Sequence, residues 1–268
     1  MLQHAEPERK NTAVVVKLSK VIGLALFLGT VSTNAIADGF PSTTTPGFAT
    51  LFGVPSAVPA PSGTAYAALT YVTPREGIAG KTPDGDVSFG FTAGNPVTGV
   101  GLAFGADITG LEPFGDAGSF SLQASRLLGI TETTATFAAI SYSGFGGWGA
   151  QRGQEKLSIY ATTFGTVGGA IPKPYLLTIG YGQDTQYTGF GTGVLEDSLF
   201  WGAGIGLTEN LSASLSGTTN QVNFGVGVRL PGLENISISA GVLDVTDAVD
   251  RRQKSITIGY SLNNLFGK

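Results

Sequence analysis

The sequence predicts an all-β protein that closes into an antiparallel up-and-down transmembrane β-barrel of about twelve strands. Three observations lead to this fold class. Apolar and polar residues alternate with period two in successive segments between residues 64 and 262, as in strands with one apolar face. These segments are about nine residues long, which suits a tilted strand that crosses a bilayer. The connections between them are alternately long and short, as expected when loops and turns gather on opposite sides of a membrane.

The alternation is easiest to follow in two neighbouring segments, 198–207 and 211–217, joined by a tight turn at 208–210. Leu199 and Trp201 belong to one face of the first segment, whereas glycines occupy much of its other face. A helix would need a period of 3.6 residues, so this pattern predicts strands.

The other segments are found by the same alternation and end at turn residues. They span 64–72, 86–93, 99–107, 119–127, 133–142, 156–164 and 175–182 before this pair, and 221–229, 235–243 and 254–262 after it. The last three carry the strongest signal. Segments 64–72 and 133–142 are weakly phased, so a count of ten strands also fits.

The connections provide a second test of the fold class. Long connections are predicted at 73–85, 108–118, 143–155, 183–197 and 244–253, and short ones at 94–98, 128–132, 165–174, 208–209 and 230–234. The alternation breaks once, at 218–220. A soluble β-sandwich, the least favoured alternative, has no reason to alternate by side.

The N-terminal part divides into two segments. Lys17 and Lys20 precede an apolar run, and Ala35-Ile36-Ala37 follows as a small-x-small cleavage site, so residues 1–37 are predicted to be a cleaved signal peptide with an extended preface. Residues 38–63 are rich in Pro, Ser, Thr and Gly and predict an extended arm, in the periplasm or folded into the lumen. The barrel domain is assigned to residues 64–268.

Composition excludes several functions. Charged residues make up 13% of the chain, the formal net charge is −4, and no basic patch would favour nucleic acid as a partner. Cysteine is absent, and the one histidine, His4, lies in the preface, so the barrel cannot supply a Ser-His pair and no enzyme activity is predicted. No cofactor is predicted. Asp244, Asp247 and Asp250 could supply oxygen ligands to calcium, but their spacing favours a solvated acidic loop, so no metal is predicted.

Several short sequences point to a known class. The leader ending Ala35-Ile36-Ala37, the turns at 129–133 (GITET) and 206–210 (GLTEN), and the alternating strands resemble a bacterial outer-membrane β-barrel protein. The resemblance covers residues 64–262 and implies location in the cell outer membrane, with outer-membrane lipid and the barrel assembly machinery as partners. One departure is the C-terminus, because such proteins usually end on an aromatic residue whereas this chain continues past Phe266.

Two sets of residues follow from the strand phases. Polar residues on the small-residue face are candidates for lining the lumen: Asp107, Gln123, Gln221, Asn223 and Arg229. Aromatic residues on the apolar face are candidates for interfacial girdles: Phe89, Phe104, Tyr181, Trp201 and Tyr260.

Two functions are compatible with such a barrel. The first is a passive channel or pore for small polar solutes, favoured because the bulky and charged side chains that seal small barrels are scarce. The second is a closed structural or surface-interaction barrel whose loops bind partners, with Phe145 and Trp148 of the 143–155 loop as exposed contacts. The identity of the solute and the oligomeric state do not follow from these patterns.

Overall fold

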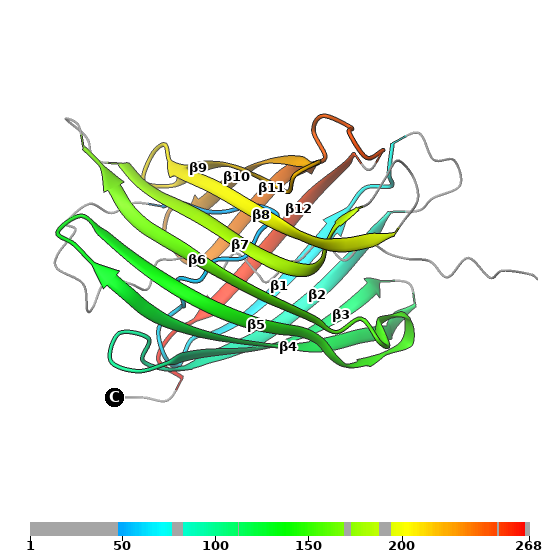
Figure 1. Ribbon diagram of the computed structural model, residues 1–268, viewed down its shortest axis with the longest axis horizontal. Coiled ribbons are helices and arrows are strands. Elements are labelled where there is room, and N and C mark those ends of the chain that lie inside the picture. The colour runs from blue at the N-terminus through cyan, green and yellow to red at the C-terminus, as the bar shows by residue number, and fades with distance from the viewer. Residues whose placement is uncertain are drawn as a thin grey trace, which may run out of the picture.

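The computed structural model describes residues 48–76, 83–111, 113–168, 173–187, 194–250 and 252–265. Within these ranges, twelve strands form one closed antiparallel barrel (Figure 1). They are β1 (Ala65–Val72), β2 (Asp84–Gly94), β3 (Gly101–Leu111), β4 (Phe114–Ile130), β5 (Thr134–Trp148), β6 (Lys156–Val167), β7 (Lys173–Tyr187), β8 (Leu195–Gly206), β9 (Leu211–Gly217), β10 (Val222–Leu230), β11 (Leu233–Leu243) and β12 (Gln253–Leu262). The predicted fold class is confirmed, with twelve strands rather than ten. The predicted signal peptide, residues 1–37, lies outside the described residues, as do residues 38–47 of the arm.

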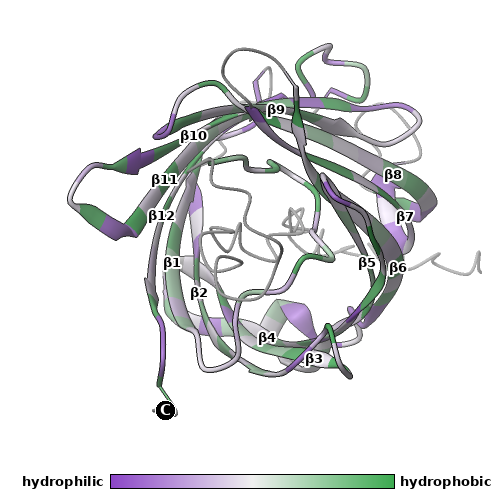
Figure 2. Cartoon of the chain, turned by 90° about the vertical axis from the view of Figure 1, so that its left-hand side faces the viewer, coloured by the Kyte–Doolittle hydropathy of each residue, from purple (hydrophilic) through white to green (hydrophobic). Residues whose placement is uncertain are grey.

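The barrel closes through its first and last strands. Each strand pairs with its sequence neighbours, and β1 also pairs with β12 along its whole length, from Ala65 opposite Leu262 to Val72 opposite Ser255. Closure leaves no strand with an unpaired edge, which the strands of an open sheet would have. Viewed end-on, the strands form a complete ring (Figure 2).

Helical structure is minimal. Between β5 and β6 the chain forms a short 3-10 helix, Gly149–Gln151. In the described ranges no helix has the length and apolar character needed to cross a membrane.

The alternation places the two faces of every strand in different surroundings. On the outside, large apolar side chains are exposed to an unusual degree, such as Ile159 at 61% and Ile179 at 62%. On the inside, small polar side chains are buried, such as Ser212 and Ser216, both at 0%. The apolar face of the sheet therefore points away from the interior, which is the reverse of a water-soluble barrel.

The two rims of the barrel differ in their connections. We call the rim at which β2, β4, β6, β8 and β10 end the turn rim, and the rim at which β1, β3, β5, β7, β9 and β11 end the loop rim. Both the start of β1 and the end of β12 lie at the turn rim.

The predicted long connection at 108–118 is wrong, because β3 and β4 continue through most of it. Ile108 pairs with Gly118 and Leu111 with Phe114, so only residues 112–113 separate the two strands. Gly110, at φ +84°, lies where the register shifts between Thr109 and Leu111. In the sequence Gly110 is typical of a loop, but in the structure it accommodates a bulge within a longer hairpin.

The exposed aromatic contacts expected in the 143–155 loop also differ from the structure. β5 extends to Trp148, and both Phe145 and Trp148 are half-buried. Their rings lie 6.0 and 5.9 Å from the ring of Phe120 on β4. The β-ladder continues past the glycines of this segment and brings the two aromatic side chains against the neighbouring strand.

The apolar core lies inside the barrel. Residues 48–63, which precede β1, pass through the interior, and we call this segment the lumen arm. Its Leu51, Val54 and Val58 form one buried cluster with side chains of the wall. The wall contributes Ala135, Phe137, Ala139, Tyr160, Leu176 and Phe200. A barrel with a polar inner face thus contains an apolar patch where the arm lies.

Replacing Leu176, which is 1% exposed, with alanine should lower the free energy of unfolding by about 2–5 kcal/mol, because it opens a cavity in this cluster. The matched control is Ile179→Ala, on the outer face of the same strand, which should cost clearly less. The measurement is urea unfolding of the detergent-folded barrel. Equal losses for the two variants would show that the inner cluster is not the tighter packing site.

Candidate functional site in the barrel lumen

The inner face of the barrel carries hydroxyl and amide side chains that bond to one another. Thr70 and Thr257 bond across the β1–β12 seam with 2.9 Å between their Oγ1 atoms, and Ser88 Oγ donates to Asp107 Oδ1 at 2.6 Å. Tyr160 donates its hydroxyl to Gln123 Oε1 at 2.7 Å. These bonds link side chains of different strands on the inner face.

The lumen arm is held to this face by hydrogen bonds along its length. Near its start, the Oγ1 of Thr50 lies 2.6 Å from the Oγ of Ser212 on β9, and the carbonyl of Phe52 accepts from Ser216. Farther along, the amide of Ala57 donates to Thr162 Oγ1 on β6 at 2.8 Å.

The second half of the arm is bonded to two further strands. The Ser56 carbonyl accepts from Gln123 Nε2 on β4 at 3.2 Å, and the Pro61 carbonyl accepts from Thr92 on β2. The arm therefore makes polar contacts with well-separated parts of the ring. Its prolines, Pro55, Pro59 and Pro61, bring no amide donors that would need partners in this interior.

Glycines on the inner face make room for the arm. A Cβ atom at Gly202 would lie 2.5 Å from Val54, and one at Gly206 would lie 2.7 Å from the Phe48 carbonyl oxygen. One at Gly204 would overlap the Thr50 carbonyl oxygen. The same holds on β10 and β11, where Gly225, Gly227 and Gly241 lie against Thr50 or Phe52. We call these six residues the glycine seat.

The arm ends in a junction that also holds the C-terminal part of the chain. Gly63 donates its amide to the Thr92 carbonyl at 2.9 Å, and its own carbonyl accepts from the Leu265 amide at 2.8 Å. Thr64 Oγ1 donates to Asn263 Oδ1 at 3.0 Å. Asn263 and Leu265, which follow β12, are thus bonded to the base of the arm at the turn rim.

The five residues predicted to line the lumen all lie on the inner side or at its rim. Gln123 and Asn223 are buried, and Asn223 Oδ1 accepts from the Asp244 amide at 3.0 Å. Gln221 Nε2 donates to Asn223 Oδ1 at 3.0 Å, and Asp107 is half-buried beside Ser88. Contact of these side chains with a passing solute stays a prediction.

Arg229, the fifth of these residues, contacts the start of the arm. Its guanidinium carbon lies 4.7 Å from the centre of the Phe48 ring, within the range of a cation–π interaction. Both ends of the lumen arm are therefore held near the turn rim, one by this contact and the other by the Gly63 junction. The sequence indicates Arg229 by its phase alone and carries no signal for its contact with Phe48.

The predicted girdle aromatics all lie on outward positions. Phe89, Tyr181, Trp201 and Tyr260 are exposed, and Phe104 is half-buried. Phe104 belongs to a row of rings that crosses neighbouring strands, with ring centres 5.7 Å from Phe91 and 5.9 Å from Phe120. The role of these residues at a membrane interface stays a prediction.

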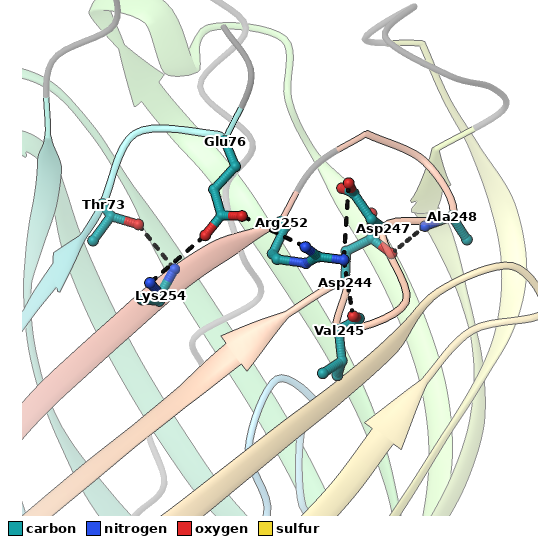
Figure 3. A network of polar contacts seen from close by, with 8 residues as sticks. All are labelled: Thr73, Glu76, Asp244, Val245, Asp247, Ala248, Arg252 and Lys254. Atoms are coloured by element: carbon teal, nitrogen blue, oxygen red, sulfur yellow. Dashed lines mark hydrogen bonds and ion pairs between the residues drawn. The ribbon is translucent and has the colours of Figure 1, made fainter.

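The acidic loop considered for calcium is held by its own contacts at the loop rim (Figure 3). Asp244 accepts from the Ala248 amide at 2.9 Å, and Asp247 lies 3.8 Å from Arg252. Glu76, from the β1–β2 connection, pairs with Arg252 at 3.5 Å and with Lys254 at 3.6 Å. Among the residues that the structure describes, no group of three His, Cys, Asp or Glu could hold a metal ion.

A second polar cluster at the loop rim was not identified from the sequence. Gln186 on β7 donates to Glu196 Oε1 at 2.8 Å and accepts from Ser198 Oγ at 2.9 Å. Its Oε1 also accepts from the Thr219 amide at 3.1 Å. These bonds tie the β9–β10 connection to the β7–β8 hairpin. A lone glutamine gives no sequence signal for such a role.

Fold and inner face together define a closed β-barrel with an apolar exterior and a polar interior. No protein-family model and no curated protein matches the chain. Solved structures that match include the KdgM porin in complex with disordered oligogalacturonate, which is 9% identical, with 75% of this chain and 99% of that chain covered and a TM-score of 0.49. The NanC porin is 7% identical, with 74% and 99% covered and a TM-score of 0.49. An outer membrane channel from Pseudomonas putida F1 is 11% identical, with 76% and 97% covered and a TM-score of 0.47. At these identities the likeness concerns the fold alone.

Replacing Thr162 with valine should loosen the lumen arm, because the buried Ala57 amide loses its acceptor at a cost of about 1–3 kcal/mol. The matched control is Thr163→Val. Thr163 faces outward on the same strand, with its Oγ1 2.9 Å from that of Thr136. Hydrogen–deuterium exchange of residues 48–60 should become faster in the first variant only. Equal exchange in both would contradict a role of Thr162 in holding the arm.

Proposed function

We propose that this protein is an outer-membrane β-barrel that acts as a passive channel for small polar solutes. One observation carries the proposal: the apolar face of the sheet is exposed on the outside and the polar face lines the inside. In water such an exterior would aggregate, whereas in a bilayer it replaces contacts between lipid chains at little cost.

Two further features support the membrane setting. Most strands reach or exceed about nine residues, the length that spans the hydrocarbon core when tilted. The loop rim, where most of the longer connections gather, corresponds to the outer side of such a barrel, and the turn rim to the periplasmic side. Outer-membrane lipid and the barrel assembly machinery are the partners that this location implies.

The interior supports passive conduction rather than chemistry. Its hydroxyl and amide groups resemble the interior of a water-filled barrel. The chain has a single histidine, His4, which precedes the barrel, so the barrel cannot assemble a Ser-His pair.

The test is single-channel current across a planar bilayer containing the purified protein, with swelling of protein-loaded liposomes in sugars of graded size. Discrete current steps that increase with salt concentration are expected, because ions would cross through a polar path. Barrels that are folded by heat-modifiable gel mobility, yet silent in both assays, would exclude the channel and favour a closed barrel that acts through its loops.

The proposed path should prefer cations. Asp86 and Asp107 face the lumen from neighbouring strands and are half-buried. The inward Lys156 and Arg229 lie apart from each other, at the loop rim and near the turn rim. Negative charge on these two carboxylates would raise the local concentration of cations on this side of the lumen.

Replacing Asp107 with asparagine should therefore shift the reversal potential, measured in a salt gradient, toward the value for no selectivity. The matched control is Asp116→Asn, because Asp116 is exposed near the start of the adjacent strand β4. An unchanged reversal potential in the Asp107 variant would rule out this carboxylate as a determinant of ion preference.

A further inference from the structure

We propose that the lumen arm is the fixed constriction of the channel, and that it stays in the glycine seat while solutes pass. This inference rests on the proposed channel function and adds which part of the chain sets its width. The arm belongs to the same polypeptide but not to the barrel wall, so the bore would be much wider without it.

The contacts of the arm join opposite sides of the ring. β4 and β10 are separated by six positions in either direction around the closed order of strands. Phe52 lies against Gly225 on β10, and Ser56 bonds to Gln123 on β4. Between these two contacts, Val54 lies against Gly202 on β8 and Ala57 bonds to Thr162 on β6. The arm therefore runs along the inner wall over half of the ring and narrows the bore from that side.

The arm is built to remain in place. Phe48, Leu51, Phe52 and Ala57 are each at most 3% exposed. Hydrogen bonds fix the arm to β2, β4, β6 and β9, at spacings of no more than five residues along its length. Releasing it would expose apolar side chains to a polar lumen and leave buried hydroxyl and amide groups without partners, and both changes cost free energy.

The glycine seat shows that the wall is shaped for this occupant. Larger residues at these positions would meet the backbone or side chains of the arm, as the Cβ positions demonstrate. On β8, β10 and β11, the room that the small inner-face residues leave is taken by residues 48–54.

The first test removes residues 48–60 from the full chain and keeps the Gly63 junction. Single-channel conductance of the deletion variant should be several-fold higher than that of the unaltered protein, and larger sugars should enter liposomes. Equal, non-zero conductance in both proteins would overturn the constriction while leaving the channel function intact. Absence of current from both folded proteins would overturn the channel function and, with it, this inference.

A point substitution tests the same idea without shortening the chain, and serves if the deletion variant does not fold. Gly204→Ala places a methyl group on the Thr50 carbonyl oxygen and should displace the arm, so conductance should rise. The matched control is Gly259→Ala, also on the inner face, where the new Cβ would lie 3.0 Å from the Oγ of Ser237 and touch no arm residue. Conductance that rises equally in the two variants would contradict the claim that the glycine seat holds the arm in place.

A cross-link separates a fixed constriction from a movable gate. The chain has no cysteine, so Thr50→Cys combined with Ser212→Cys provides one pair, at positions whose hydroxyl oxygens are 2.6 Å apart. Conductance should be the same with the disulfide formed and after reduction, because the arm does not leave its seat. A several-fold increase on reduction would show that the arm moves, and would overturn the fixed constriction.

Discussion

The closure of β1 on β12 is the constraint from which the rest of the structure follows. Once the ring is closed, every strand has two neighbours and the side-chain parity of each strand is locked to that of the next. Thr70 opposite Thr257 and Ser88 opposite Asp107 are pairs of inward residues for this reason. A slip of one residue in any pair would turn apolar side chains into the lumen and hydroxyls outward. Backbone pairing alone therefore sorts the chain into an apolar exterior and a polar interior.

The small polar side chains of the inner face leave space inside the ring, and the lumen arm occupies part of it. A ring of twelve strands is too wide for serine and threonine side chains to fill, so it stays hollow unless another segment enters. The arm enters from the turn rim, brings apolar side chains to Phe137, Leu176 and Phe200, and returns to the same rim at Gly63. The apolar patch of the wall and the apolar arm compensate each other, and the barrel acquires a core on its inner side.

The sequence predicts the outer part of this structure far better than the inner part. Exposed residues such as Leu199 and Trp201 alternate with glycine, and this contrast specifies strand, phase and face from local residues alone. Strand ends are less well predicted, because β3, β4 and β5 continue through glycines that elsewhere mark loops. Continuation there depends on pairing with the adjacent strand, which a single segment does not reveal.

The sequence leaves the position of the arm open between the periplasm and the lumen, because many of the residues that the arm packs against are glycines, which carry no side chain. Residues 48–63 have no period, and the inner glycines signal only small volume. A usable signal does exist in combination: Gly202, Gly204 and Gly206 share one face, as do Gly225 and Gly227, and a proline-rich segment with several apolar residues precedes the barrel. Glycine costs strand stability, so repeated glycines on one inner face indicate that something else lies against it. In a barrel whose outer face meets lipid, the chain's own N-terminal segment can reach that inner face without crossing the wall.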